Sequence, residues 1–301
     1  MKRIGIVEVG LRDGLQNEAT VVPTAQKVTL LEQLVAAGLS RIEAVSFVHP
    51  RLVPAMADAE AVMALAPRRP GVSYAGLVLN ERGFERALAA EMDEINLVVC
   101  ASDTFNRRNQ NASRDETLSQ VLALTRRARE AQLFATVTIA VAFGCPFEGE
   151  VDPQTVISIA REAIGAGAQE ICLADTIGVG VPPQVTTLGR AVRALPGPDI
   201  SLRFHFHNTR NTGYANAVAA LEAGADVLYA SIGGLGGCPF APKATGNIAT
   251  EDLIYLLDRM SVGHPGELSA LLPLTGTVSS AVGHPTSSLV ARAGPFPRTP
   301  A

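Results

Sequence analysis

The feature that most constrains this chain is a strict alternation of short apolar runs with longer helix-compatible segments. Parallel strands need a crossover connection, which is usually a helix, so this alternation predicts a parallel sheet. Eight such units are typical of a closed (β/α)8 barrel, the TIM barrel. The eight strand-like runs lie at residues 4–9, 41–47, 73–79, 94–100, 135–143, 170–174, 201–207 and 227–232. The helix-compatible segments include residues 24–37, 54–65, 114–131, 153–166 and 211–223.

A repeated phrase marks the points where helices end and strands begin. The pairs Ala37-Gly38, Ala166-Gly167 and Ala223-Gly224 each precede a short apolar run, and glycine commonly ends a helix. An open, doubly wound sheet is the alternative, but it would want a phosphate-binding glycine loop after the first strand. The sequence from Gly10 to Gly14 does not fit G-x-G-x-x-G. We therefore predict an α/β fold, a (β/α)8 TIM barrel with a short C-terminal extension.

The length of the chain suggests how it is divided. Its 301 residues exceed the roughly 250 that such a barrel typically needs. The eighth unit is complete near Met260, so we expect residues 1–260 to form the catalytic barrel. Residues 261–301 are expected to form a C-terminal helical extension, with a helical piece at residues 268–272, and a flexible proline-rich tail. We expect the last stretch, from Gly294 onward, to be disordered.

Composition argues against several classes of partner. The net charge is -4 and the pI is about 5.8, without a basic stripe, which argues against nucleic acid. No apolar run reaches the roughly 20 residues of a membrane helix, so no membrane partner is expected. A strand begins by about Ile4, which leaves no room for a signal peptide, and we expect a cytoplasmic protein. The four cysteines are then expected to be free thiols: Cys100, Cys145, Cys172 and Cys238.

Polar residues collect after the first strand-like run. Arg12, Asp13, Gln16 and Glu18 follow Gly10 within a few positions, a concentration that solubility alone would not require. TIM-barrel enzymes place their active sites at the carboxyl ends of the strands. The same argument selects residues on or after four other runs, namely Glu43, Ser46, Asp175, Thr176, His205, His207, Cys238 and Asn247.

The pair His205 and His207 gives the sharpest signal for a metal site. Alternate residues on a strand face the same way, roughly 6–7 Å apart, so both imidazoles can point into the barrel. With Asp13 they form a set of two histidines and one carboxylate, which the amide oxygen of Asn247 could complete. Mixed nitrogen and oxygen ligands suit Mg²⁺ or Mn²⁺ better than a closed zinc site. The alternative is that one histidine caps a strand and the other is solvated.

Two charged residues near this set have competing interpretations. Arg12 could hold a carboxylate or thioester oxygen and stabilise an enolate, or it could form a surface salt bridge. Glu43 lies in an otherwise apolar run, and a buried carboxylate needs a partner. Arg12 could be that partner, which would give Glu43 a structural role.

A glycine-rich loop surrounds one thiol. Residues 233–247 carry glycines on both sides of Cys238, so the loop could close over a substrate and deliver this thiol as an acid or base. A mobile loop with an incidental cysteine is the alternative. A similar phrase, Gly144-Cys-Pro-Phe-Glu-Gly149, follows the fifth run, so the Cys-Pro turn could be structural in both places.

Taken together, these motifs resemble the hydroxymethylglutaryl-CoA lyases, which belong to the superfamily of metal-dependent lyase and Claisen-synthase barrels. The resemblance extends from about Val7 to Asp258 and includes Asp175-Thr-Ile-Gly-Val-Gly, His205-x-His and Gly246-Asn. It implies three catalytic residues, Arg12, His205 and Cys238. It implies a divalent cation, Mg²⁺ or Mn²⁺, bound by Asp13, His205, His207 and Asn247. The residues implied to bind substrate are Arg12, Gln16, Glu43, Ser46, Asp175 and Thr176.

The resemblance also implies a reaction. An acyl-CoA substrate with a 3-hydroxyl would be cleaved between C2 and C3 by retro-Claisen chemistry, giving acetyl-CoA and a keto acid, which is acetoacetate for hydroxymethylglutaryl-CoA. The family further implies a homo-oligomer, a dimer or tetramer, and a role in leucine degradation. A lyase for citramalyl- or methylmalyl-CoA, a Claisen-type acyltransferase and a catalytically silent binding module are the alternatives.

Three departures from the family pattern bear on the acyl group. Asn208 stands where the family commonly has aspartate, and Phe206 stands between the two histidines where a smaller residue is usual. Thr136 and Thr138 occupy the positions of a common Arg-x-Tyr pair. These hydroxyls carry no charge. Either another cation contacts the substrate carboxylate, with Lys243 and Arg210 the nearest candidates in sequence, or the preferred acyl group differs from hydroxymethylglutaryl.

Overall fold

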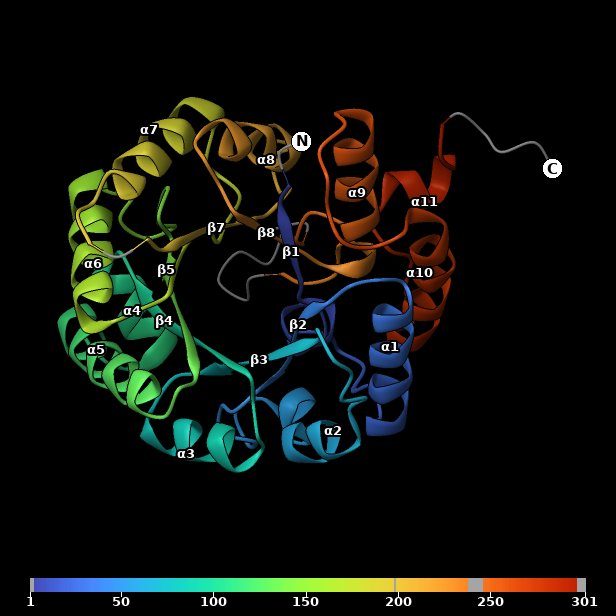
Figure 1. The fold of residues 1–301 in the computed structure, drawn as a ribbon, viewed down its shortest axis with the longest axis horizontal. Coiled ribbons are helices and arrows are strands. Elements are labelled where there is room, and N and C mark those ends of the chain that lie inside the picture. Colours follow the sequence, from blue (N-terminus) through green and yellow to red (C-terminus); the bar gives the residue numbers. More distant parts are fainter. Residues whose placement is uncertain (1–2, 198, 238–245, 297–301) are drawn as a thin grey trace.

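The computed structural model describes residues 3–197, 199–237 and 246–296. Eight parallel strands form a closed barrel in which each strand pairs with the next and β8 pairs with β1 (Figure 1). The predicted TIM-barrel class is therefore confirmed. The strands are β1 Gly5–Glu8, β2 Arg41–Ser46, β3 Ser73–Val78, β4 Glu94–Cys100, β5 Phe134–Ala140, β6 Glu170–Asp175, β7 Ser201–Phe206 and β8 Val227–Ala230.

Helices surround the barrel as an outer ring (Figure 1). The α-helices are α1 Thr24–Ala36, α2 Ala59–Leu65, α3 Glu81–Ala89, α4 Asp103–Gln110, α5 Arg114–Glu130, α6 Pro153–Ala166, α7 Pro182–Arg193, α8 Gly213–Glu222, α9 Thr250–Arg259, α10 Leu268–Val282 and α11 Leu289–Ala293. Three short helical turns are the π-helical η1 Gly10–Gly14 and the 3-10 turns η2 Pro54–Met56 and η3 Ile232–Gly234. None of the described helices is both long and apolar enough to span a membrane.

Two of the expected barrel elements differ clearly in extent. The fifth strand ends at Ala140 because Val141 takes a positive φ of 51°, a conformation that β-branched residues adopt rarely and that cannot continue a strand. The segment expected as one helix at residues 54–65 is divided into η2 and α2.

The amino end of the barrel holds a buried ion network, which we call the basal network. Arg41 pairs with Glu94 at 2.6 Å and with Glu170 at 2.9 Å, and Glu170 also pairs with the fully buried Arg203. The hydroxyl of Thr136 donates to Glu170 at 2.9 Å. Thr136 is therefore part of this network.

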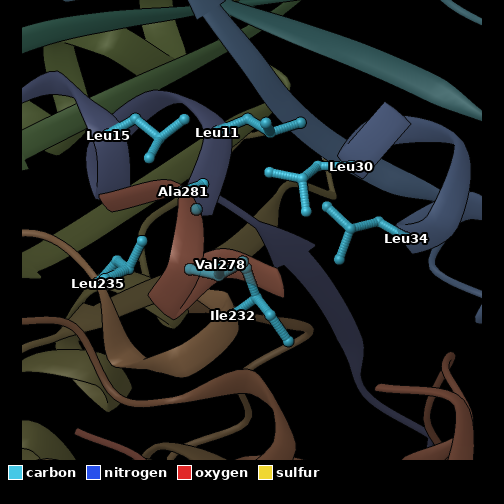
Figure 2. Close-up of a pocket in the computed structure, with 9 residues that line it drawn as sticks. Leu11, Leu15, Leu30, Leu34, Ile232, Leu235, Val278 and Ala281 are labelled. Atoms are coloured by element: carbon cyan, nitrogen blue, oxygen red, sulfur yellow. The ribbon is translucent and has the colours of Figure 1, made fainter. Parts of the chain in front are cut away.

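The C-terminal segment packs against the barrel. Helix α10 is longer than the piece expected at residues 268–272, because its apolar face continues through Val278 and Ala281. Figure 2 shows these side chains facing Leu11 and Leu15, with a cavity of only about 10 Å³ between them. Helix α10 thus packs against the turn that carries Arg12 and Asp13. The division of the chain near residue 260 stays a prediction.

Candidate active site

The turn η1 delivers the first site residues at the carboxyl end of β1. The strand ends at Glu8, and the chain then folds back so that the amide of Gly14 donates to the carbonyl of Val9 at 3.1 Å. This π-helical turn holds Arg12, which is 6% exposed, and Asp13 at the barrel mouth. Turns of this kind occur frequently at functional sites.

Three of the predicted metal ligands lie together. One ligand atom from each of Asp13, His205 and His207 lies within 4.8 Å of the others. The two imidazole rings are stacked with their centroids 4.9 Å apart, as expected for alternate positions on one strand. His207 lies one residue beyond β7 and forms an isolated bridge with Asn247, the fourth predicted ligand.

Hydrogen bonds orient the donor atoms. The Nδ1 of His207 donates to the carbonyl oxygen of Asp175 at 2.9 Å, so its Nε2 retains a lone pair. The amide nitrogen of Asn247 donates to Asp13 Oδ2 at 2.9 Å and to the carbonyl of Leu235 at 2.8 Å. Its Oδ1 then faces His205 Nε2 at 2.5 Å. Such supporting hydrogen bonds fix ligand orientation in metal sites.

The protonation states also fit a cation. Burial, followed by the nearby His207, lowers the pKa of His205 to about 3, so its ring is neutral near pH 7. Burial alone would raise the pKa of Asp13, but Arg12 and the two histidines hold it below its usual range. Metal ligands must be deprotonated. The donor set of two imidazoles, one carboxylate and one amide oxygen therefore fits a divalent cation.

Arg12 is held by two carboxylates. Its Nε pairs with Glu43, and its Nη1 pairs with Asp13 at 2.5 Å. Glu43 also accepts hydrogen bonds from the hydroxyl of Tyr229 and from Asn96 Nδ2, the latter at 3.1 Å. Glu43 therefore has the structural partner that its buried position required. One arginine balances two carboxylates here, so the site carries a formal charge of -1 when both histidines are neutral.

A cavity of about 440 Å³ opens beside these residues. Of the residues predicted to bind substrate, Arg12, Gln16 and Thr176 line it. The described lining does not include Glu43, Ser46 or Asp175, and a substrate-binding role for these three stays a prediction. Further lining residues are Leu77, Val98, Cys100, Ala140, Ala174, Asn96 and Thr138.

Asp175 is engaged elsewhere in the turn after β6. Its carboxylate accepts hydrogen bonds from the backbone amides of Val179 and Gly180, both at 2.9 Å. Arg210, suggested as a substitute cation, donates to the carbonyls of Ile177 and Gly178, both at 3.0 Å. Both side chains therefore stabilise the loop between β6 and α7.

Cys238 and Lys243 lie outside the described residues. The loop is described as far as Gly237, whose carbonyl accepts a hydrogen bond from Asn17 Nδ2 at 2.8 Å. The other three cysteines, Cys100, Cys145 and Cys172, are buried, and Cys145 and Cys172 are free, as expected.

Sequence reasoning missed three polar residues in and around the site. Asn96 lies at the inner end of the cavity and bonds to Thr138, Glu43 and Tyr229. Tyr229 reaches Glu43 across the barrel, and Glu8 contacts the start of η1. Asn96 and Glu8 are polar residues within apolar strand-like runs, which is the signal that identified Glu43.

The sequence of this chain is similar to those of known proteins. The HMGL-like family model matches residues 3–278. A Chloroflexus aurantiacus protein named (R)-citramalyl-CoA lyase is 44% identical, over 98% of this chain and 96% of its own. A Bacillus subtilis protein named hydroxymethylglutaryl-CoA lyase is 42% identical, over 95% of this chain and 96% of its own.

The fold of this chain is also similar to that of solved structures. The structure of an HMG-CoA lyase from Acinetobacter baumannii in complex with coenzyme A and 3-methylmalate superposes with a TM-score of 0.94. It is 39% identical to this chain, and the match covers 99% of this chain and 97% of that one.

Proposed function

Because this chain belongs to the HMGL-like family, we infer that it is a divalent-metal-dependent carbon–carbon lyase that acts on an acyl-CoA thioester. It performs retro-Claisen cleavage and releases acetyl-CoA and a keto acid. Family membership confirms the resemblance drawn from the motifs. The observation that carries the activity is the convergence of Asp13, His205, His207 and Asn247 beside Arg12 at one cavity.

We assign the metal site to these four residues and propose Mg²⁺ or Mn²⁺ as the ion. Their donor atoms suit such a cation, and the formal charge of -1 attracts it. When bound, the ion supplies Lewis-acid polarisation of substrate oxygens. The low pKa of His205 favours a neutral ligand over a proton acceptor near pH 7, so the catalytic role implied for this residue is assigned to ligation.

Arg12 is proposed to stabilise charge during cleavage. The hydroxyl proton goes to a base, and the C2–C3 bond breaks. Its electron pair enters the enolate of the acyl-CoA product, which is acetyl-CoA where C2 carries no substituent, while the carbinol carbon becomes a carbonyl. The two ion pairs fix the Arg12 guanidinium at the cavity wall, so its charge is oriented before the enolate forms. Cys238 is proposed to return the proton to C2.

These assignments can be tested separately. His205→Ala should lower metal affinity or turnover at least about tenfold, because loss of even a supporting contact costs that much. Cys238→Ser should lower kcat by about 10²–10⁴-fold, as expected for a positioned proton donor, with unchanged metal content. Full activity of His205→Ala in excess chelator, or an acyl–Cys238 adduct trapped during turnover, would contradict the respective role.

The cavity lining supports a proposal about the acyl group. Arg12 is the one cation among the described lining residues. The inner end is formed by Thr138, whose hydroxyl donates to Asn96 Oδ1 at 2.7 Å, while Asn96 Nδ2 donates to Glu43 and Tyr229. The donors of Thr138 and Asn96, among the described residues at this end, are therefore already used and are not available to a carboxylate. Losing a charged hydrogen-bond partner costs about 1.5–3 kcal/mol.

We therefore propose that the substrate carboxylate binds beside Arg12 and the metal ligands, which suits a carboxylate attached directly to the hydroxyl-bearing carbon. Citramalyl- and methylmalyl-type thioesters have this arrangement, whereas hydroxymethylglutaryl-CoA has one more methylene. We expect such a thioester to be cleaved as well as or better than hydroxymethylglutaryl-CoA. Measuring kcat/KM for each thioester decides this, and a hundredfold preference for hydroxymethylglutaryl-CoA would contradict it.

A cytoplasmic location, a dimeric or tetrameric assembly and a role in leucine degradation remain proposals. The bacterial relatives named above are consistent with the first. Light scattering of the purified chain tests the assembly. Growth of a deletion strain on leucine tests the pathway.

A further inference from the structure

A fully buried carboxylate outside the cavity, Glu8, contacts both turns that lead to the site. Glu8 is the last residue of β1. Its neighbours Val7 and Val9 pack with Tyr229 inside the barrel. Because side chains alternate along a strand, Glu8 points to the outer face. It therefore does not line the cavity and would not touch a substrate.

The Glu8 carboxylate joins three elements. Its Oε1 accepts hydrogen bonds from the amide of Gly10, at 2.7 Å, and from the amide of Ile232, at 2.8 Å. Its Oε2 accepts from the hydroxyl of Thr250 at 2.5 Å. These residues begin η1, η3 and α9 respectively. A Cβ at Gly10 would lie 2.7 Å from Glu8 Oε1 and 2.8 Å from Ile232 Cγ2, so this junction requires glycine.

Each of the two turns supports a proposed metal ligand: η1 carries Asp13, and the residue that follows η3 contacts Asn247. The turn η3 runs into Leu235, whose carbonyl accepts a hydrogen bond from Asn247 Nδ2. The same Nδ2 donates to Asp13 Oδ2 at 2.9 Å. One carboxylate thus fixes the start of both segments whose ends bring Asp13 and Asn247 together.

We propose that Glu8 is a positioning residue that sets the metal affinity of the site by fixing η1 relative to η3. The proposal rests on the metal-binding role proposed above for Asp13 and Asn247. Misplacement of a reacting group by about 1 Å can cost about a hundredfold in rate, and loss of supporting contacts typically costs 10- to 100-fold in metal affinity.

The hydrogen-bonding pattern, rather than the charge, makes Glu8 suitable. No cation pairs with it among the residues that the structure describes, and burial raises its pKa to about 7 against the hydrogen bonds from Thr250, Ile232 and Gly10. Two of its partners are backbone donors, and the third is a hydroxyl that can donate or accept. A glutamine could keep all three bonds, with its Nε2 donating to the Thr250 hydroxyl.

The test is Mn²⁺ affinity, measured by calorimetry on the full-length chain and its variants. Glu8→Gln should bind Mn²⁺ within about threefold of the unmodified protein, whereas Glu8→Ala should bind about 10- to 100-fold more weakly. Thr250→Val removes one of the three bonds and should give an intermediate loss, so the test stands even where Glu8→Ala does not fold. A matched control is Glu251→Ala, because Glu251 accepts from the backbone amide of Gly233 in η3 and has no hydrogen bond to η1 among the described residues. Its affinity for Mn²⁺ should fall less than about threefold.

Specific outcomes would overturn the proposal. One is a folded Glu8→Ala protein with unchanged Mn²⁺ affinity. Another is Glu8→Gln binding as weakly as Glu8→Ala, and a third is an equal loss in Glu251→Ala. An unmodified protein that binds no divalent ion would overturn the metal-site assignment itself and this inference with it.

Discussion

The two ends of the barrel each bury charged side chains, but the charges are balanced at only one of them. The basal network contains two arginines, Arg41 and Arg203, and two carboxylates, Glu94 and Glu170. At the carboxyl end, Arg12 faces two carboxylates, Asp13 and Glu43. The basal charges cancel within the protein, whereas the site retains a formal charge of -1 with neutral histidines.

This difference separates a structural cluster from a functional one. A buried charge is costly unless it is paired, and the basal carboxylates have all of their partners within the chain. The uncompensated charge at the other end lies beside a cavity of about 440 Å³ and two imidazoles, of which that of His205 is neutral near pH 7. A cation from solution would balance the charge at the carboxyl end, whereas the charges of the described basal residues already balance one another.

The largest expected effect on catalysis comes from removing the charge of Asp13 at the carboxyl end of the barrel. Asp13→Asn keeps the shape of the side chain but removes a proposed metal ligand and one of the two carboxylates that pair with Arg12. We expect kcat/KM to fall by about 10²–10⁴-fold, combining losses of the kind seen for supporting metal contacts and for charge-stabilising donors. The free energy of unfolding should also fall, because the pKa of Asp13 is held below its usual range and its ionised form stabilises the fold. The fall should stay below the roughly 3–5 kcal/mol of an unpaired buried charge, because Arg12 keeps Glu43. Steady-state kinetics at saturating Mn²⁺ and urea unfolding of the metal-free protein measure the two quantities.

The matched change at the basal end should have the opposite profile. Glu170→Gln leaves Arg203 and part of Arg41 without their carboxylate, and an uncompensated buried charge costs about 3–5 kcal/mol of stability. Turnover per folded molecule should stay within about threefold, because no basal residue lines the cavity in the described part of the chain. A fall in turnover per folded molecule well beyond threefold would show that the basal network also supports catalysis. The two ends of the barrel would then not differ in role.

The barrel fold could be predicted from the sequence because the signals for it are local. Apolar runs, helix stops such as Gly167 and the alternation of His205 with His207 depend on neighbouring residues. The extent of α10 depends on its packing against Leu11 and Leu15, more than 250 positions earlier. The difference between Thr136 and Thr138, one in the basal network and one at the cavity, depends on depth along β5. A sequence pattern does not encode these distances.

Glu8 offers a further comparison with the basal network. It is buried near the carboxyl end of the barrel and has no charged partner among the described residues. Its pKa is raised from 4.5 to about 7, mainly by burial. The folded protein therefore binds more protons than the unfolded chain between these values, so this contribution to stability is complete below about pH 4.5 and is lost as the pH rises through about 7. A shift of this size corresponds to a contribution of at most about 3 kcal/mol.

Glu8→Gln should remove this pH dependence, since the amide keeps the hydrogen bonds without a charge. Relative to the unmodified protein, we expect Glu8→Gln to gain up to about 3 kcal/mol in stability between pH 4.5 and pH 8, measured by urea unfolding at several pH values. Glu251→Gln should behave similarly, because burial also raises the pKa of Glu251 to about 7. A stability difference that stays constant with pH would mean that Glu8 remains ionised throughout. An unbalanced buried charge would then persist outside the proposed metal site as well as within it.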